Sequence, residues 1–249
     1  MAGGSASGAS VTQRALALVA AFDEDHRRLT LTELAERADI PLSTAHRLVA
    51  ELVAWGALAR SGDGAYVVGR RLWDVGLLAP VRAGLVEVAS PFLHDLFGAT
   101  RATVHLAVRE GTEALYLDRL RGHSSVPVVS TVGSRLPLHA TGVGKVLLAH
   151  APREVQRAVL ADLRGVTPYT VTQPGLLSRQ LEAVRREDLA TTREEMSLGA
   201  CSLAVPVRRG ETVVAALGVV VADLRRDRTR LLSGLQVAAR GIGRSFTRP

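Results

Sequence analysis

The sequence is poor in cysteine and in aromatic residues. Cys201 is its one cysteine, and aromatic residues make up only 4% of the chain. A single cysteine excludes an internal disulfide framework and any zinc site built from several cysteines. It also suits a reducing compartment, so we expect a cytoplasmic protein.

Segments that would direct the chain to a membrane are missing as well. No apolar run reaches the roughly 20 residues that a membrane-spanning helix needs. Residues 1–10 (MAGGSASGAS) are small and polar and lack the basic and apolar stretches of a signal peptide. We therefore predict no membrane partner and a disordered tail over residues 1–10.

The size and charge of the chain leave room for a nucleic-acid partner without proving one. Its 249 residues are enough for two globular domains with aliphatic cores. The formal net charge is +7, which favours a polyanionic partner. However, the first 80 residues hold eight arginines against nine acidic residues. A DNA-binding function must therefore be argued from individual helix faces.

A helix-turn-helix pattern lies near the start of the chain. After an amphipathic helix over Val11–Asp23, Thr30 and Glu33 form a capping-box pattern that opens a helix over Leu31–Ala38. Asp39-Ile40-Pro41 breaks this helix, and a second one is predicted over Leu42–Trp55. Small or apolar residues recur at five-residue intervals across the break, as helix-turn-helix units require: Ala35, Ile40 and Ala45.

The second of these helices has a face suited to DNA. Its outward positions hold side chains that can donate hydrogen bonds to base edges and phosphates: Ser43, Thr44, His46 and Arg47. Two short strands, Leu58–Arg60 and Ala65–Val68, flank a Gly-rich turn and predict a wing that adds Arg60. A three-helix module that contacts only protein stays open as the alternative interpretation.

The rest of the chain alternates between helical and strand patterns. A boundary between domains is expected between residues 70 and 85. Helices are predicted over Arg70–Leu85, Val86–Phe97, Thr141–Ala149, Arg153–Leu163, Leu176–Glu187 and Asp227–Phe246. Strands are predicted over Arg101–Val108, Ala114–Asp118, Val126–Ser130, Ser202–Val207 and Thr212–Val221.

Three segments in order resemble the IclR-type transcriptional regulators. They are LTLTELAERADIPLSTAHRLVAELVAWGAL with the following YVVGRRLWDVG, RLPLHATGVGKVLLA (Arg135–Ala149), and REEMSLGACSLAVPVRRGETVVAALGVV (Arg193–Val220). The resemblance implies a two-domain α+β protein: a tail (1–10), a winged helix-turn-helix (11–70), a linker helix (71–85) and a GAF-like α/β effector-binding domain (86–249). It also implies homodimers through the N-terminal region, often dimers of dimers, that bind a double-stranded DNA operator and respond to a small-molecule effector.

The segment LHATGVGK predicts one wall of an effector pocket. Thr141 can cap the helix that follows, and the backbone N–H groups of Gly142 and Val143 at its start favour an anion such as a carboxylate. The alternative is that Gly142 and Gly144 only let the helix pack closely on a sheet. The Ser/Thr after Lys145 that a phosphate-binding loop would need is missing, and Lys145 is interpreted as structural.

The third segment predicts the floor of the same pocket. By the resemblance, the floor positions are Thr192, Ser202, Gly218 and Val220, where members that bind small hydroxy or keto acids have more polar residues. Two hydrogen-bonding positions are thus lost. We therefore expect an aromatic or apolar carboxylate. Glu195 and Gly199 also match the segment and are assigned to loop shape.

Catalysis and metal binding find little support in the sequence. Cys201 beside a strand is interpreted as a small buried residue. The histidines show no metal-binding spacing; His105 and His139 could meet in the fold, although ordinary core or surface positions are favoured. We expect no enzyme, no cofactor and no metal. Two alternatives stay open: an architectural DNA binder without ligand, and an enzyme built on the C-terminal domain.

Overall fold

The computed structural model describes residues 9–23, 25–77, 83–122, 126, 129–225 and 227–246. The chain divides into two compact units, Met1–Val81 and Arg82–Pro249. Of the expected tail, residues 1–8 lie outside the described part. Ser10, the last residue of that expected tail, instead caps the first helix: its hydroxyl accepts a hydrogen bond from the Gln13 amide.

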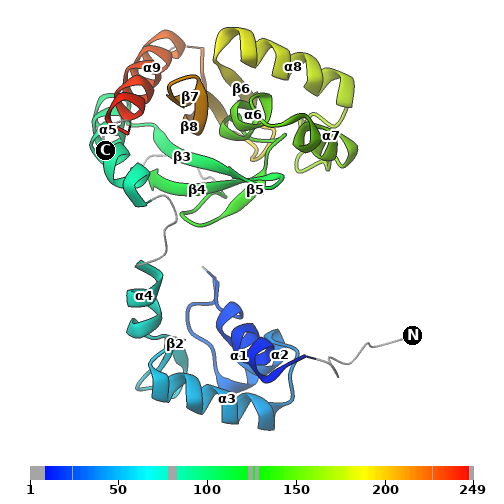
Figure 1. The fold of residues 1–249 in the computed structure, drawn as a ribbon, viewed down its shortest axis with the longest axis vertical. Coiled ribbons are helices and arrows are strands. Elements are labelled where there is room, and N and C mark those ends of the chain that lie inside the picture. Colours follow the sequence, from blue (N-terminus) through cyan, green and yellow to red (C-terminus); the bar gives the residue numbers. More distant parts are fainter. Residues whose placement is uncertain are drawn as a thin grey trace. The chain divides into compact units, whose positions relative to one another are not determined.

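The N-terminal unit is a three-helix module followed by a hairpin and a further helix (Figure 1). Its elements are α1 (Val11–Ala20), α2 (Leu31–Arg37), α3 (Leu42–Trp55), β1 (Leu58–Arg60), β2 (Tyr66–Val68) and α4 (Arg70–Leu77). A small apolar core joins the three helices and the hairpin and includes Leu18, Leu34, Ala35, Ala45, Leu48 and Leu58. Two short strands and three helices around one core are the parts of a winged helix.

Local contacts explain why α2 and α3 meet at the turn between them. The predicted capping box is confirmed: the Thr30 hydroxyl accepts from the Glu33 amide, and the Glu33 carboxylate accepts from the Thr30 amide. Asp39 adopts the left-handed conformation with φ of 52°, which aspartate tolerates better than most residues. The Ile40 amide then donates to the Ala35 carbonyl over 3.0 Å and closes the turn.

The C-terminal unit is built on an antiparallel six-stranded sheet in the described residues, with strand order β5-β4-β3-β8-β7-β6. The helices are α5 (Ala83–Thr100), α6 (Gly142–Ala149), α7 (Arg153–Ala161), α8 (Pro174–Glu187) and α9 (Arg228–Ser245). The strands are β3 (Thr103–Glu110), β4 (Glu113–Leu120), β5 (Arg135–Pro137), β6 (Ala190–Arg193), β7 (Cys201–Arg209) and β8 (Thr212–Val221).

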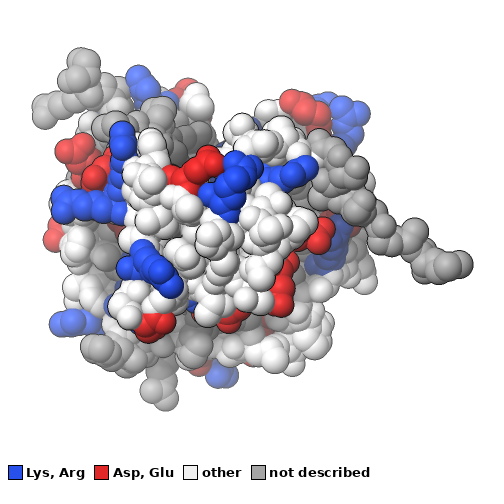
Figure 2. All heavy atoms as spheres, turned by 90° about the horizontal axis from the view of Figure 1, so that it is seen from below, with Lys and Arg blue, Asp and Glu red and all other residues white. Residues whose placement is uncertain are grey.

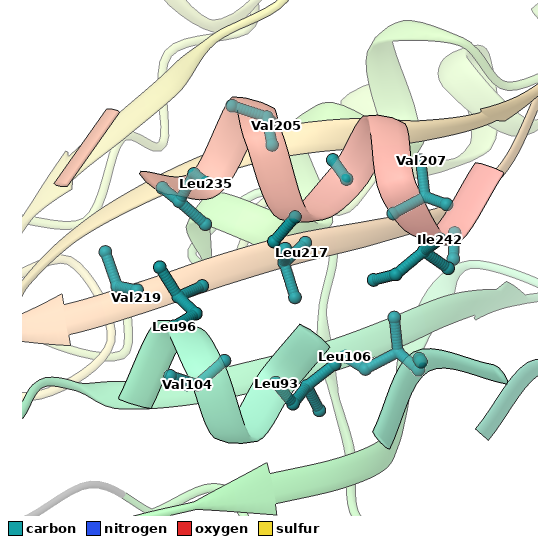
Figure 3. Packing of buried hydrophobic residues seen from close by; sticks show 14 of the residues in the cluster. Leu93, Leu96, Val104, Leu106, Val205, Val207, Leu217, Val219, Leu235 and Ile242 are labelled. Atoms are coloured by element: carbon teal, nitrogen blue, oxygen red, sulfur yellow. The ribbon is translucent and has the colours of Figure 1, made fainter. Parts of the chain in front are cut away.

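Helices cover both faces of this sheet. On one face, α5 and α9 pack against alternate residues of β3, β7 and β8, where the labelled side chains of Figure 3 interlock. On the other face, α6 packs against the sheet at Ala107, Ala204 and Ala216, and α7 and α8 pack against α6. Because these facing residues are small, α6 lies close to the sheet, and the pocket described below forms at its start.

Three sequence expectations differ from the structure. The four-residue edge strand β6 was not expected, because a run this short next to a charged helix end has no clear period. The strand expected over Val126–Ser130 is wrong at its described residues (126, 129 and 130), and the edge strand is β5 instead. The expected helix over Arg70–Leu85 corresponds to α4 and the start of α5, while residues 78–82 lie outside the described part.

Among the helices that the structure describes, none is both long and apolar enough to span a membrane.

Candidate functional site

The expected DNA-reading residues share the outer side of α3. Ser43, His46 and Arg47 are exposed and Thr44 is half-buried, while Ala45, Leu48 and Val49 are buried against α1 and α2. Arg60 is also exposed, at the end of β1. The structure therefore places all five expected residues in one unit, four of them on one helix that is held in place from behind.

Arg47 is the one arginine of α3, and its ion pair with Glu51 is exposed. Its guanidinium lies 2.8 Å from the carboxylate of Glu51, one helical turn away, and both side chains are more than half exposed. Exposed pairs of this kind contribute about 0–1 kcal/mol, so Arg47 can exchange Glu51 for a phosphate or a base at little cost. On the face drawn in Figure 2, basic and acidic side chains are interspersed and form no continuous basic patch.

A pocket lies in the C-terminal unit between the start of α6 and the sheet. Its cavity is small: about 50 Å³ is open to the centres of water-sized probes. Every residue expected for the effector lines it: Thr141, Gly142, Val143, Thr192, Ser202, Gly218 and Val220. These come from α6 and three strands, so only the folded sheet brings them together.

The start of α6 presents hydrogen-bond donors to this pocket. The Thr141 side chain caps the helix by accepting from the Gly144 amide over 3.1 Å. The N–H groups of Gly142 and Val143 precede the first intrahelical bonds and have no partner within the helix. A side chain at residue 142 would overlap the Ser202 hydroxyl, whereas one at Gly144 would overlap the Leu138 backbone. Gly144 therefore serves packing, and Gly142 keeps the pocket wall open.

Two hydroxyl groups face this helix start from the sheet. Thr192 and Ser202 pair across β6 and β7, and their hydroxyl oxygens lie 2.6 Å apart. The next residue in this row is Val220, and the following row contains Gly218, against which Val143 packs. The pocket floor is therefore polar on the side of β7 and apolar over β8.

Sequence reasoning missed four polar residues of the pocket: His105, Tyr116, Ser130 and Ser197. The His105 ring nitrogen Nε2 lies 2.8 Å from the Ser130 hydroxyl, and its ring meets Tyr116 edge-on at 5.1 Å. Burial, with a smaller contribution from the Arg119 charge, lowers the pKa of His105 to about 3, so its ring is neutral near pH 7. Burial also raises the pKa of Tyr116. The sequence held one signal for this part of the pocket, namely a histidine within the mainly apolar strand β3.

Lys145, the one lysine of the chain, is buried behind the pocket. Its side chain is 1% exposed, and its Nζ lies 2.6 and 2.7 Å from the two carboxylate oxygens of Glu195 and 2.8 Å from the Gln180 amide oxygen. Burial lowers the pKa of Lys145, and Glu195 opposes that shift. Glu195 adjoins Met196 and Ser197, which line the pocket, so the ion pair joins α6 to the pocket's outer wall.

Neither a nucleophile nor a metal site emerges from the described residues. Cys201 is half-buried, and burial raises the pKa of its thiol, which favours the unreactive protonated form. His105 bonds Ser130, whereas His139 Nε2 lies 2.9 Å from the Arg164 carbonyl oxygen, so each ring has its own partner. In the part of the chain that the structure describes, no three His, Cys, Asp or Glu residues form a group that could hold a metal.

In a comparison with known proteins, both units of the chain match domains of the same family. Residues 11–62 match the IclR helix-turn-helix domain, and residues 79–244 match the C-terminal domain of bacterial transcriptional regulator IclR. The transcriptional regulator BhcR of Paracoccus denitrificans is 36% identical over 211 residues, which cover 82% of this chain and 74% of the relative. The repressor AllR of Salmonella typhimurium is 30% identical over 230 residues, covering 91% and 85%.

Solved structures agree in fold over nearly the whole chain. An IclR homolog from Microbacterium hydrocarbonoxydans, crystallised as a complex with 4-hydroxybenzoate, is 36% identical with a TM-score of 0.90 and covers 95% of this chain and 99% of its own. The Thermotoga maritima IclR is 27% identical with a TM-score of 0.80, covering 95% and 98%.

Proposed function

The chain belongs to the IclR family of ligand-responsive, DNA-binding transcriptional regulators, and from this premise we propose that its pocket binds a carboxylate with an aromatic or apolar body. One observation supports this ligand class above all others. The start of α6, where the first N–H groups have no partner within the helix, lines the same cavity as the apolar floor of Gly218 and Val220. Amide donors at a helix start suit an anion, and apolar walls suit a hydrocarbon body.

The ligand of the Microbacterium relative is compatible with this class, because 4-hydroxybenzoate combines a carboxylate with a ring. For the present chain, the carboxylate would accept from the Gly142 and Val143 amides. The helix dipole would add about 0.3–2 kcal/mol, and burial of the ring would supply most of the affinity.

On the DNA side, we propose that α3 enters the major groove and that its outer residues contact bases and phosphates, with Arg60 of the wing beside the backbone. Regulators of this kind bind two half-sites, so two copies must act together. Exposed apolar side chains in the N-terminal unit support a homodimer contact there: Leu16, Trp73 and Val75 are 62%, 58% and 49% exposed. A dimer of dimers is the further expectation.

Effector binding would then act through spacing. A ligand that binds one arrangement of the dimer better than another shifts the population toward it, and the separation of the two α3 helices changes with it. The chain would act by binding alone, without catalysis, and in the cytoplasm, where the operator DNA lies.

Arg47→Ala tests the DNA-binding part. If Arg47 makes a bidentate base contact, the change should cost about 1–3 kcal/mol of operator affinity, measured by fluorescence anisotropy on an operator fragment. Glu51→Ala is the matched control, because it removes the ion-pair partner of Arg47 and leaves the arginine in place. The operator affinity of this variant should equal or exceed that of the unmodified protein. Unchanged affinity of Arg47→Ala, with an unchanged circular dichroism spectrum, would remove Arg47 from the reading face.

A calorimetric screen tests the ligand class. Benzoate and its derivatives should bind the full-length protein, while two- and three-carbon keto acids should bind weakly because they bury little apolar area. Binding of the keto acids alone would contradict the proposal. An architectural DNA binder would show no ligand-dependent change in operator affinity, and an enzyme would consume the bound compound.

A further inference from the structure

A groove lies on the C-terminal unit where one edge of β7 becomes free. β6 pairs with β7 only over Cys201–Ala204, so in the described part of the chain no strand lies beside residues 205–209 on that side. The groove opens along this free edge and is bordered by Asp188, at the end of α8, and by α9. Its volume is about 760 Å³ on the measure that gives about 50 Å³ for the pocket at α6, and the two share no lining residue.

The helix α9 follows β7 along the groove. Its buried residues Leu235 and Ile242 belong to the same apolar cluster as Val205, and Figure 3 shows the helix running along the strand. Gly243 lies directly against the strand backbone, since a Cβ there would come within 2.2 Å of the Arg208 carbonyl oxygen. The outer face of this half of α9 therefore forms one side of the groove.

The groove has positive charge that no acidic group balances. Its charged lining residues are three arginines and one aspartate. Arg208 pairs with Asp188 over 2.8 Å, which leaves Arg240 and Arg244. Both are exposed, and neither is in an ion pair among the residues that the structure describes. They lie one helical turn apart, where like charges repel each other, so an anionic partner would relieve this repulsion.

The same helix face also has an apolar side chain. Val237 lines the groove and is 64% exposed, the largest fraction among the large apolar side chains in the described ranges. It lies within one turn of Arg240 and on the same face as both arginines. Phosphates of a nucleic acid would pair with the arginines and leave Val237 in water. A peptide with acidic and apolar side chains can contact all three residues.

An extended peptide matches the spacing of these residues. Arg240 and Arg244 are about 6 Å apart along the helix axis, and alternate residues of a strand are about 6.6–6.8 Å apart and share a face. The lining stretch of β7 and its turn, residues 205–210, extends over roughly 17 Å, enough for about five residues of extended chain. One apolar and two acidic residues at alternate positions would thus face Val237, Arg240 and Arg244 in turn.

We propose that this groove binds an extended acidic segment of another protein. The segment lies along the free edge of β7, and its carboxylates pair with Arg240 and Arg244 while an apolar side chain covers Val237. The effector pocket and α3 take no part, so this inference goes beyond the proposed function and can fail separately from it.

Fluorescence anisotropy with labelled peptides and the full-length protein tests the spacing. The peptide ETETVTETE presents the required pattern in either chain direction. Its matched control, EETTVTTEE, has the same composition and charge but no two acidic residues at alternate positions. The control can form one ion pair fewer, so it should bind about three- to fivefold more weakly. ETETTTETE, which lacks the apolar residue, should also bind more weakly than ETETVTETE.

Two double variants connect this preference to the groove. Arg240→Gln/Arg244→Gln should weaken binding of ETETVTETE about tenfold and remove its advantage over the control peptide. Arg228→Gln/Arg230→Gln is the matched control, because it removes the same charge from exposed positions of α9 outside the groove. It should weaken binding less than about twofold, since salt screens charges that do not touch the peptide. Circular dichroism checks that both variants are folded.

Other outcomes would overturn the proposal. It fails if ETETVTETE shows no saturable binding, if the two isomeric peptides bind equally, or if both double variants weaken binding alike. Equal binding of ETETTTETE would show a site for any polyanion. Displacement of the peptide by a DNA duplex of unrelated sequence, with duplex affinity lost in Arg240→Gln/Arg244→Gln, would assign the arginines to DNA. A smaller assembly of that variant in light scattering would assign the groove to a contact between copies of this chain.

Discussion

Replacing Lys145 by methionine should destabilise the C-terminal unit strongly. The change keeps the length of the side chain but leaves the Glu195 carboxylate buried, with a side chain only 7% exposed, and without its cation. Removing one partner of a buried ion pair typically costs about 3–5 kcal/mol, mostly because the remaining charge is neither solvated nor paired. The Gln180 amide could turn its N–H₂ toward Glu195 and recover a small part of this loss.

The double variant Lys145→Met/Glu195→Leu separates charge from packing. With both charges removed, the desolvation cost disappears together with the attraction, so we expect a loss of no more than about 1–2 kcal/mol. The Glu195 backbone carbonyl should keep its bond from the Thr170 hydroxyl, 2.7 Å in length, and hold the loop near its place. The double variant should therefore be clearly more stable than Lys145→Met alone.

Urea denaturation of the full-length protein can follow the two units separately. Both tryptophans, Trp55 and Trp73, lie in the N-terminal unit, so tryptophan fluorescence serves as an internal control that should not shift. Far-UV circular dichroism reports both units, and its remaining transition should move to lower urea for Lys145→Met. A cost below 1 kcal/mol, or a double variant as unstable as the single one, would refute the argument that an uncompensated buried charge is the cause.

Two further predictions concern pH and assembly. The pKa of His105 is lowered to about 3 in the folded chain, so below about pH 6.5 the unfolded chain binds a proton that the folded chain does not. The free energy of unfolding should therefore fall by about 2 kcal/mol between pH 7 and pH 5. His105→Gln should remove that part of the pH dependence in urea denaturation, and an unaltered pH slope would contradict it. Replacing both Trp73 and Val75 by aspartate should shift the protein to monomers in light scattering and abolish tight binding to a two-half-site operator; an unchanged assembly would place the dimer contact elsewhere.

Several elements could be predicted because their causes are local. The capping box of Thr30 and Glu33 acts over three residues, and the structure confirms it. The bounds of Leu42–Trp55 were also predicted correctly, since Pro41 precedes this helix and Gly56 follows its last residue. Interactions between near neighbours are encoded in spacing, so a single sequence suffices for them.

Other elements depended on partners far along the chain. β6 is a strand only because β7 pairs with it, and its four residues show no clear period by themselves. The strand expected over Val126–Ser130 had suitable residues, but the sheet edge is occupied by β5, which pairs with β4. Residue type alone does not decide which of two short segments joins a sheet.

The sequence by itself therefore determined the helix-turn-helix, the outward side chains of α3 and, partly through the resemblance, seven of the residues that line the pocket. Only the tertiary structure decided what stands opposite them. Ser130 and His105 are 25 residues apart, and Lys145 and Glu195 are 50 apart, yet each pair is in hydrogen-bonding contact. Such contacts arise when β3, β8 and α6 pack together and exclude water, and burial then makes His105 neutral and the ion pair costly to break. No spacing rule along one chain encodes them.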